Sequence, residues 1–408
     1  MATNAKNLAE LLNTDTTVAV GDIADGSVTT AKLAASAVTT AKVADDAVTT
    51  AKLFAENLGR RNVIINGAME IAQRGTSATG KTGSGIYTVD RMALGIDSLG
   101  TWTVTQESLT SGAAYNAGFK KAFRIDCTTA DASPASSDNI FFQYKLEGQD
   151  LKTFRKGTSS AKQFTLQFWV KSNKTGTGQV LLQDKDNNRF VGKTYTISSA
   201  NTWEQKILTF PADTTGAFDN DNNKSLEIEW ALDAGSNFTS GTLPATWTTG
   251  SNTQRSVNDF ALGDSTNNDW AITGIQLEAG DTATPFEHRS FGEELALCQR
   301  YFCQLVNNTG SNLYLGILQA YNTSSAYGMI KDYPATMRAD PSVSQSGNFG
   351  GFNYTSGTWN SGSAWGNFAG TSVGWYTGGT GASSNLTAGH AVVIFHVAGS
   401  KLMADAEL

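Results

Sequence analysis

A ten-residue phrase that repeats between Val18 and Leu53 constrains this chain more than any other feature of its sequence. Val-Thr-Thr-Ala-Lys recurs in strict phase in three copies, Gly26–Ala34, Ser36–Ala44 and Asp46–Leu53. Val18 and Ile23 keep the same register one unit earlier, so the array has at least four units. Each unit offers only two large apolar side chains, which do not offset an ordering cost of about 1–2 kcal/mol per residue. One copy of this stretch therefore cannot fold alone.

The five-residue spacing of the large apolar side chains suits neither a regular helix nor a strand. It favours a short extended piece around each Val-Thr, followed by a Thr-capped helical turn, with Asp, Gly or Ser at the joints. Such units become stable when they stack and other chains supply the missing apolar surface. We predict that residues 18–57 form a slender homotrimeric stalk. The alternative is a disordered Ala/Thr linker. A flexible linker depends on its composition and does not require the ten-residue repeat to stay in phase.

The composition favours a mainly β fold. Charged residues make up 16% of the 408 residues and glycine is abundant, as in chains of many short strands joined by tight turns. The net charge of −7 gives no basic footprint, so we expect no nucleic-acid partner. Residues 1–12 lack the apolar core of a signal peptide, and no apolar run reaches the ~18 residues of a membrane span. We therefore expect synthesis in a host cytoplasm.

The three cysteines, Cys127, Cys298 and Cys303, are an odd number without the spacing of a metal site. Cys298 and Cys303 are five positions apart on a predicted helix, where they point to different faces and should not pair. Together with a reducing compartment, this predicts buried free thiols.

The chain divides into five predicted segments. Residues 1–17 carry Leu8, Leu11 and Leu12 at helical spacing and form an attachment segment before the stalk. Residues 58–289 contain nine or so strand-like segments with turn clusters between them, which predicts a two-sheet sandwich. The clearest of these segments are residues 102–104, 122–127, 140–146, 164–171, 179–182, 193–197, 204–210, 226–232 and 270–277.

The remaining two segments complete the chain. Ser290 and Glu293 have the form of a capping box, so we predict a linking helix over residues 290–305. Residues 306–408 return to strands and form a small β-rich tip, the expected receptor-binding domain. Its predicted strands span residues 313–320, 326–331, 352–354 and 391–397.

Three stretches, residues 66–70, 164–171 and 270–277, resemble the first, middle and last strands of jelly-roll carbohydrate-binding modules. The resemblance implies a jelly-roll sandwich for residues 58–289. In that family an opening Glu and an acidic residue of the last strand often hold a structural calcium ion. Glu70 matches, but Thr273 and Gly274 take the acidic place, so we predict no cofactor.

Residues 61–75 and 276–302 look like segments that recur in tail fibre and tail appendage proteins of tailed phages, as do the Thr-Thr-Ala-Lys decapeptides of residues 26–53. Together these stretches cover residues 18 to about 305. The resemblance implies a homotrimeric fibre in the virion, joined to phage tail proteins through its amino terminus. It also implies a host partner, a surface glycan or an outer-membrane receptor.

Two short motifs match catalytic or nucleotide-binding patterns only formally. Gly75–Thr82 spells a P-loop, but Gly83-Ser84-Gly85 would break the helix that must follow it. Gly370–Gly374 spells a nucleophile elbow, but no acidic residue lies between Ser372 and His390, so the triad order fails.

Charged groups also give no strong site. The three histidines, His288, His390 and His396, lack metal spacing. Glu227 and Glu229 share a strand face and suit a glycosidase pair in principle. The favoured alternative is two solvated carboxylates on a sandwich edge. Asp219–Asn223 starts like a calcium loop, but Lys224 and Trp230 occupy key positions, which predicts a turn. We predict no catalytic or metal-binding residues.

The most unusual composition is the Gly/Ser/Thr-rich segment from Gly347 to Gly381, which holds eight aromatic residues. Sugar rings present apolar faces that Trp and Tyr cover while nearby Asn, Ser and Thr bind the hydroxyls. We predict glycan contacts for Tyr354, Trp359, Trp365, Trp375 and Tyr376. The alternative is that these rings form the core of a small β domain.

These patterns predict a homotrimeric phage tail fibre that attaches to a host surface through glycan binding by its distal domains. Three tips that engage one surface would make weak sites sufficient. Two alternatives stay open: a structural spacer or adaptor of the tail without host contact, and a tailspike that degrades glycans.

Overall fold

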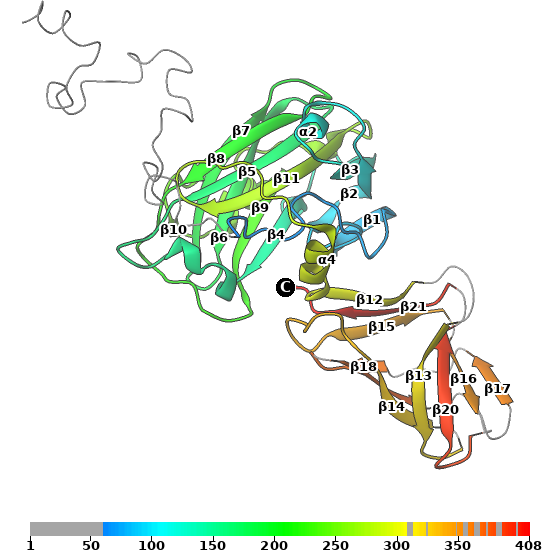
Figure 1. Ribbon diagram of the computed structural model, residues 1–408. Helices are drawn as coiled ribbons and strands as arrows, with labels where there is room; N and C mark the ends of the chain where they lie inside the picture. Colours follow the sequence, from blue (N-terminus) through cyan, green and yellow to red (C-terminus); the bar gives the residue numbers. More distant parts are fainter. Residues whose placement is uncertain are drawn as a thin grey trace, which may run out of the picture. The chain divides into compact units, whose positions relative to one another are not determined.

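Strands dominate the part of the chain that the computed structural model describes. That part is residues 60–408, with gaps at 308–312, 324, 348, 354–357, 363–367, 373, 381–385 and 397–398. Figure 1 shows the strands and the few short helices among them. The predicted attachment segment (1–17) and decapeptide stalk (18–57) lie outside the described residues. The predicted mainly β class is confirmed.

The first eleven strands belong to one hydrogen-bonded antiparallel sheet system. They are β1 (Ser77–Gly85), β2 (Ala93–Ser108), β3 (Lys121–Thr129), β4 (Asn139–Glu147), β5 (Phe164–Ser172), β6 (Gly176–Asp184), β7 (Arg189–Ile197), β8 (Glu204–Phe210), β9 (Lys224–Ala234), β10 (Thr248–Thr249) and β11 (Asp269–Ala279). Their order is β10-β7-β6-β9-β4-β2-β3-β11-β5-β8, and β1 pairs with β2 outside this path. Two short helices, α2 (Ala113–Asn116) and α3 (Ser236–Thr239), lie in the connections.

A bend in β2 folds this sheet into two layers. The first part of β2, residues 93–98, pairs with β4, and the second part, residues 101–108, pairs with β3. Between them Ser98 and Gly100 have positive φ angles of 54° and 64°. A side chain at Gly100 would meet the carbonyl oxygen of Thr129 at 2.5 Å, so the bend requires glycine. One layer is therefore β10-β7-β6-β9-β4, and the other is β3-β11-β5-β8.

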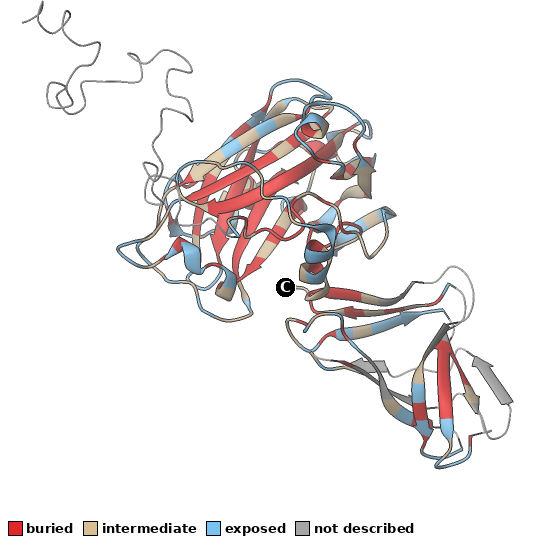
Figure 2. Ribbon diagram, viewed as in Figure 1, coloured by how far each residue is buried: buried red, intermediate tan, exposed pale blue. Residues whose placement is uncertain are grey.

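Aromatic side chains fill the space between the two layers. Phe142 of β4 contacts Phe123 of β3 and Trp270 of β11, with ring centroids 4.9 and 5.4 Å apart. Trp230 of β9 contacts Phe168 of β5 edge to face at 5.6 Å. These side chains are fully buried, and Figure 2 shows the same burial along the central strands. The alternation of apolar residues in the sequence thus produces a sandwich core.

The nine clearest strand segments predicted for the sandwich are strands in the structure. Residues 66–70, which resembled the first strand of a jelly roll, are not a strand, because the Met69 amide donates to the Asn66 carbonyl at 2.9 Å and closes a turn. Two further strands, β1 and β10, were not predicted. The formal P-loop runs into β1, which continues to Gly85 and pairs with β2, so no helix follows it. The buried parallel strand and phosphate-facing helix of a P-loop are therefore missing at Gly75–Thr82.

The helix after the sandwich is shorter than predicted. Helix α4 covers Phe291–Gln299, and Ser290 caps it by accepting a hydrogen bond from the Glu293 amide at 3.3 Å. Phe302 begins strand β12 (Phe302–Asn307), which pairs with a strand near the carboxyl terminus. The segment predicted as one helix over residues 290–305 therefore divides between a helix and a strand.

Two antiparallel sheets follow α4. The first has the order β12-β21-β15, with β15 (Ser342–Ser346) and β21 (Lys401–Asp405). The second has the order β17-β16-β20-β13-β14-β19-β18. Its strands are β13 (Leu313–Ala320), β14 (Ser325–Asp332), β16 (Phe349–Asn353), β17 (Thr358–Gly362), β18 (Phe368–Gly370), β19 (Gly374–Thr380) and β20 (Ala391–His396). A core that includes Leu318, Phe349, Ile394 and Leu402 lies among these strands.

Residues near the carboxyl terminus bind back to the sandwich, and residues 60–408 form one unit. Arg91, whose side chain is 2% exposed, pairs with Glu407, and its guanidinium lies 3.5 Å from the centre of the Tyr301 ring. Arg74 pairs with Asp405 at 3.0 Å. Lys145 donates a hydrogen bond to the carbonyl oxygen of Leu408 at 2.7 Å. The last residues of the tip therefore hold it to the sandwich.

The three cysteines are buried thiols, as predicted. Burial also raises the pKa of the Cys298 thiol well above its usual range, with the nearby carboxyl of Asp90 adding to the shift. Within residues 60–408, as far as they are described, no helix is long and apolar enough to cross a membrane.

Candidate functional site

Glu227 and Glu229, the only carboxylate pair singled out from the sequence, are buried on a central strand. Strand β9 lies between β6 and β4, and the two side chains face away from the sandwich core. The amide of Gln143 donates to both carboxylates, at 2.9 and 2.8 Å. Arg255, from the connection after α3, binds Glu229 with two hydrogen bonds of 2.9 and 2.5 Å. The expectation of solvated carboxylates on an edge was wrong, because the chain between β9 and β11 covers this face.

The electrostatics around Glu227 favour its ionised form. Burial alone would raise the pKa of Glu227, but Lys185 and Lys224 outweigh it and hold the pKa below its usual range. Lys224 lies 2.7 Å from Glu227, and Arg255 neutralises Glu229. A glycosidase acid needs a carboxyl group with a raised pKa. This arrangement is a network of ion pairs that fixes the outer face of the sheet.

The calcium ligands of carbohydrate-binding modules do not fit this chain. Glu70 is half-buried, and its charged neighbours include the ammonium groups of Lys121 and Lys120. Burial raises the pKa of Glu70, and these lysines oppose the shift. Thr273 uses its hydroxyl to donate to the Lys121 carbonyl at 2.7 Å. A calcium ion needs several oxygen ligands and would be repelled by the two lysines.

The second formal motif, Gly370–Gly374, lies in a hairpin. Strand β18 ends at Gly370 and β19 begins at Gly374, and the Thr371 amide donates to the Gly374 carbonyl at 3.0 Å. The Ser372 amide donates to Asp340 at 2.7 Å. A strand follows Ser372 where a nucleophile elbow requires a helix.

The structure places the predicted glycan-contacting residues on different strands. Trp359 lies in β17, at one end of the seven-stranded order, and Trp375 and Tyr376 lie in β19, near the other end. Tyr354 and Trp365 lie outside the described residues. Glycan contact by these five residues stays a prediction. Phe349, from the same aromatic segment, is 1% exposed and belongs to the core of the tip. For this residue the alternative holds, in which the aromatic rings form the core of a small β domain.

Two other aromatic residues of the tip are exposed side by side. Tyr321 follows β13 and Tyr327 lies in β14, and their side chains are 72% and 46% exposed. The ring centroids lie 5.8 Å apart at an interplanar angle of 76°, an edge-to-face pair. Ile317, on the same side of β13, is 67% exposed. We call Ile317, Tyr321 and Tyr327 the tyrosine platform. Exposed aromatic and aliphatic side chains that lie together are candidates for a binding surface.

Backbone hydrogen bonds hold the tyrosine platform in place. The Tyr321 amide donates to the Ser325 carbonyl at 2.8 Å and closes the turn between β13 and β14. Ala320 donates to the His390 carbonyl at 2.9 Å, and Gly389 donates back to Ala320 at 2.8 Å. The alternate residues Leu318 and Ala320 are buried on the opposite side of β13. The two tyrosines are therefore presented by a fixed hairpin.

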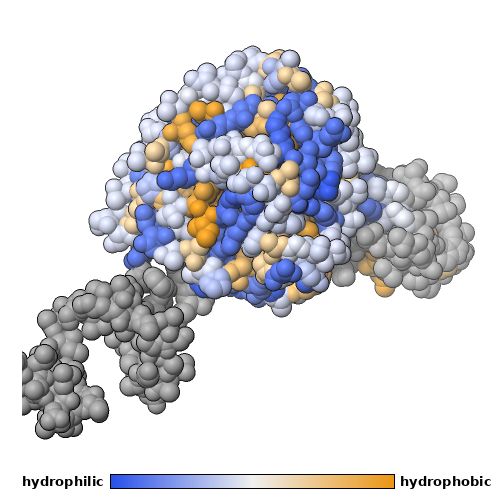
Figure 3. Space-filling view, turned by 90° about the horizontal axis from the view of Figure 1, so that it is seen from above, coloured by the Kyte–Doolittle hydropathy of each residue, from blue (hydrophilic) through white to orange (hydrophobic). Residues whose placement is uncertain are grey.

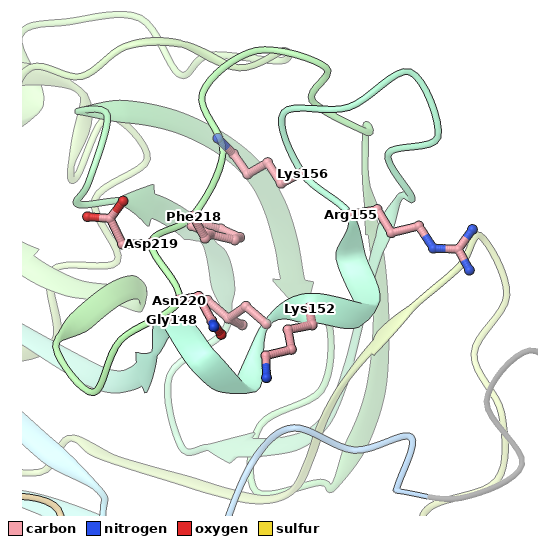
Figure 4. A pocket seen from close by; sticks show the side chains of 8 residues that line it. Gly148, Lys152, Arg155, Lys156, Phe218, Asp219 and Asn220 are labelled. Carbon is pink, nitrogen blue, oxygen red and sulfur yellow. The ribbon is translucent and has the colours of Figure 1, made fainter.

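A pocket of about 230 Å³ lies on the sandwich between two loops. One loop follows β4 and contributes Gly148, Leu151, Lys152, Arg155 and Lys156; the other precedes β9 and contributes Phe218, Asp219 and Asn220. Figure 4 shows Phe218 at the centre of this group. The predicted turn at Asp219–Asn223 is confirmed, since Asp221 accepts a hydrogen bond from the Asn223 amide at 2.9 Å.

Sequence reasoning identified neither the tyrosine platform nor the pocket. The platform had no clear signal, because Ile317 and Leu318 are adjacent apolar residues and only the structure shows that Ile317 is exposed and Leu318 buried. The pocket had none, since its two loops lie more than 60 residues apart in the chain.

No protein-family model matches this chain, and no curated protein does. Solved structures do match. The enzymatically active domain of tailspike protein 4 of bacteriophage CBA120 is 13% identical with a TM-score of 0.27, and the match covers 54% of this chain and 21% of that chain. This chain thus spans about a fifth of that structure.

Two sugar-binding proteins match over a similar part. A putative sugar binding protein from Bacteroides thetaiotaomicron is 13% identical with a TM-score of 0.27, and the match covers 53% of this chain and 99% of that chain. The module TmCBM61, solved with beta-1,4-galactotriose, is 8% identical with a TM-score of 0.25. The match covers 54% of this chain and 99% of that chain. At these values the likeness assigns this chain to no family and no function.

Proposed function

We propose that this protein is a homotrimeric tail fibre of a phage that attaches to a host surface by binding glycans. The observation that carries the glycan-binding part is the exposed edge-to-face pair of Tyr321 and Tyr327 on the tip. The decapeptide array of residues 18–57 supports the fibre, because units of its kind need other chains to be stable.

The chemistry of the tyrosine platform suits a sugar. Each phenol ring offers an apolar face for the C–H side of a pyranose, and its hydroxyl group binds the sugar hydroxyls. Gln319, paired with Tyr327 across the two strands and exposed, adds an amide beside the rings. An open surface of this kind binds weakly, and three copies on one surface would compensate through avidity.

The face of the molecule seen in Figure 3 is mostly hydrophilic and has separate apolar areas.

A microarray of bacterial surface polysaccharides tests the proposal. The intact protein should bind at least one polysaccharide and leave its length unchanged. Release of soluble sugar from a polysaccharide would favour the tailspike alternative. A protein that binds isolated phage tails but no polysaccharide would favour the spacer alternative.

A further inference from the structure

We infer that the sandwich carries a second saccharide site, the pocket between residues 148–156 and 218–220, which takes a single sugar ring that bears a carboxylate. The inference rests on the proposed saccharide-binding function, but the pocket shares no residue with the tyrosine platform.

The pocket presents an aromatic ring beside polar and cationic groups. Phe218 is half-buried, and its ring packs edge to face on the core residue Phe164, with centroids 6.4 Å apart. In Figure 4 Lys152 and Asn220 lie on one side of Phe218, and the side chains of Arg155 and Asp219 point away from it. Phe218, Asn220 and Lys152 line one pocket, with the Lys152 ammonium directed away from the Phe218 ring, on the far side of Asn220 (Figure 4).

The size of the pocket limits its ligand. Its volume of about 230 Å³ is below the ~300–1,000 Å³ of pockets that enclose drug-sized ligands. A single pyranose fits this scale, whereas several consecutive sugars do not. The pocket therefore suits the end or a side branch of a glycan chain.

A buried lysine fixes the loop that carries Phe218. The Lys156 side chain is 0% exposed, and its ammonium donates to the carbonyl oxygens of Gly216 and Thr215 at 2.6 and 3.2 Å. It also pairs with Asp184 and Asp213. The Lys156 ammonium lies 5.0 Å from the centre of the Phe218 ring. The loop is thus held from inside before a ligand arrives.

The two walls of the pocket are also joined directly. Gln149 donates from its amide to the Asp221 carbonyl at 2.9 Å, and Asp219 donates from its amide to Asp186 at 2.9 Å. A side chain at Gly148 would meet the Asp219 carbonyl oxygen at 1.9 Å, so only glycine allows this close approach. A site that is organised in advance binds with a smaller entropy cost.

The groups present define the class of ligand. The open part of the Phe218 ring suits the C–H face of a pyranose, and the Asn220 amide can donate to and accept from ring hydroxyls. Lys152 is exposed at the pocket and supplies a charge-assisted hydrogen bond to a carboxylate. A uronic acid has this combination of a ring face, hydroxyls and a carboxylate.

Saturation-transfer NMR on the full chain tests the inference, with methyl glucuronoside and methyl glucoside as probes. Both should receive saturation from the protein, and the acid should bind roughly tenfold more tightly because of its charged hydrogen bond. Phe218→Ala should abolish transfer to both. Lys152→Gln should remove the preference for the acid and leave binding of the glucoside.

Matched variants keep the outcome clear. Asn220→Ala changes an exposed side chain and should weaken binding without unfolding, and Phe218→Tyr should retain it. Phe291→Ala removes a phenylalanine outside the pocket that is 62% exposed, and it should leave binding of both probes unchanged.

Absence of saturation transfer to either probe, or transfer that survives Phe218→Ala, would overturn the site. Equal binding of the two probes would overturn the assignment to an acidic sugar. Loss of polysaccharide binding in the variant Tyr321→Ala/Tyr327→Ala reports on the proposed function separately.

Discussion

The ammonium of Lys156 lies 3.2 Å from the carboxylate of Asp213, and both side chains are buried at the side of the sandwich. Asp184 and the carbonyls of Thr215 and Gly216 complete a set of oxygen atoms around the ammonium. The cation neutralises two carboxylates from different connections and so joins them. Burial would raise the pKa of Asp213, but Arg189, Thr215 and Lys156 lower it below its usual range.

Replacing this lysine should be costly. Lys156→Met leaves the Asp184 and Asp213 carboxylates buried without their shared cation, and such a loss costs about 3–5 kcal/mol. Urea unfolding of the variant and the wild type measures the difference. Lys174→Met is the control, because Lys174 pairs with Asp264 at the surface, where the loss is about 0–1 kcal/mol. Equal losses in the two variants would contradict this role of Lys156.

The oxygen atoms around the Lys156 ammonium lead to a second prediction, which concerns metal binding. Lys156→Ala removes the ammonium and leaves two carboxylates and two carbonyls, the ligand types that calcium prefers. Addition of calcium should raise the melting temperature of Lys156→Ala and not that of the wild type. A variant that responds to calcium no more than the wild type would show that the oxygen atoms collapse without the lysine.

The strands of the sandwich could be predicted from the sequence because their pattern is local. Phe164, Leu166, Phe168 and Val170 alternate with polar residues, and all four are in the core. The Lys156 cluster could not be predicted, since its partners at residues 184, 213 and 216 meet only through the topology. Glu229 was expected in solvent as most carboxylates are, but Arg255 arrives from a later connection and buries it.

In the tip, too, contacts between residues that are distant in the chain could not be predicted from the sequence. The predicted strand at Leu313–Ala320 is confirmed as β13, but the pairing of β12 with β21 joins residues about 100 positions apart. The sequence at Phe302–Asn307 therefore looked like the continuation of a helix. For the same reason the predicted aromatic group, which is continuous in the sequence, is divided between β17 and β19.

The attachment of the carboxyl terminus should contribute to stability. Glu407→Ala leaves the Arg91 guanidinium buried without its carboxylate, which should lower the free energy of unfolding by about 3 kcal/mol. Thermal unfolding of the full chain measures this. Glu293→Ala is the control, since Glu293 and Arg60 form an exposed pair worth about 0–1 kcal/mol. A loss no larger than that of the control would mean that Arg91 is satisfied by Tyr301 and the Lys145 carbonyl alone.

Asp233 should make stability depend on pH. Burial, with the nearby Asp259 adding to it, raises the pKa of this carboxyl from 3.8 to about 7. The folded state therefore holds a proton that the unfolded state releases at lower pH, so this stabilisation is present below about pH 4 and is lost as the pH rises through about 7.

Asp233→Asn removes the titration, and the amide oxygen can still accept the Gly263 hydrogen bond of 2.7 Å. The free energy of unfolding, measured in urea across this range, should fall less steeply with rising pH than in the wild type. The variant Asp97→Asn, at an exposed position, should follow the wild type. Parallel curves for Asp233→Asn and the wild type would refute the prediction.

The oligomeric state follows from the decapeptide array. Three chains of 43.2 kDa give a particle of about 130 kDa, the mass that light scattering should report. Deletion of residues 1–57 should give monomers if the array drives assembly. Trimers that survive the deletion would move assembly to the later residues, and a monomeric intact chain would remove the main support for a fibre.

Polysaccharide binding by the intact chain and by Tyr321→Ala/Tyr327→Ala is the decisive test of glycan attachment through the tip. Both side chains are exposed, so the double variant should keep the melting temperature and the solution mass of the wild type. We predict that the wild type binds at least one bacterial surface polysaccharide on an array and that the variant loses this binding. A wild type that binds none, or a variant that binds equally well, would contradict glycan attachment through the tip. A variant with a lower solution mass would show that the tyrosine platform joins subunits instead.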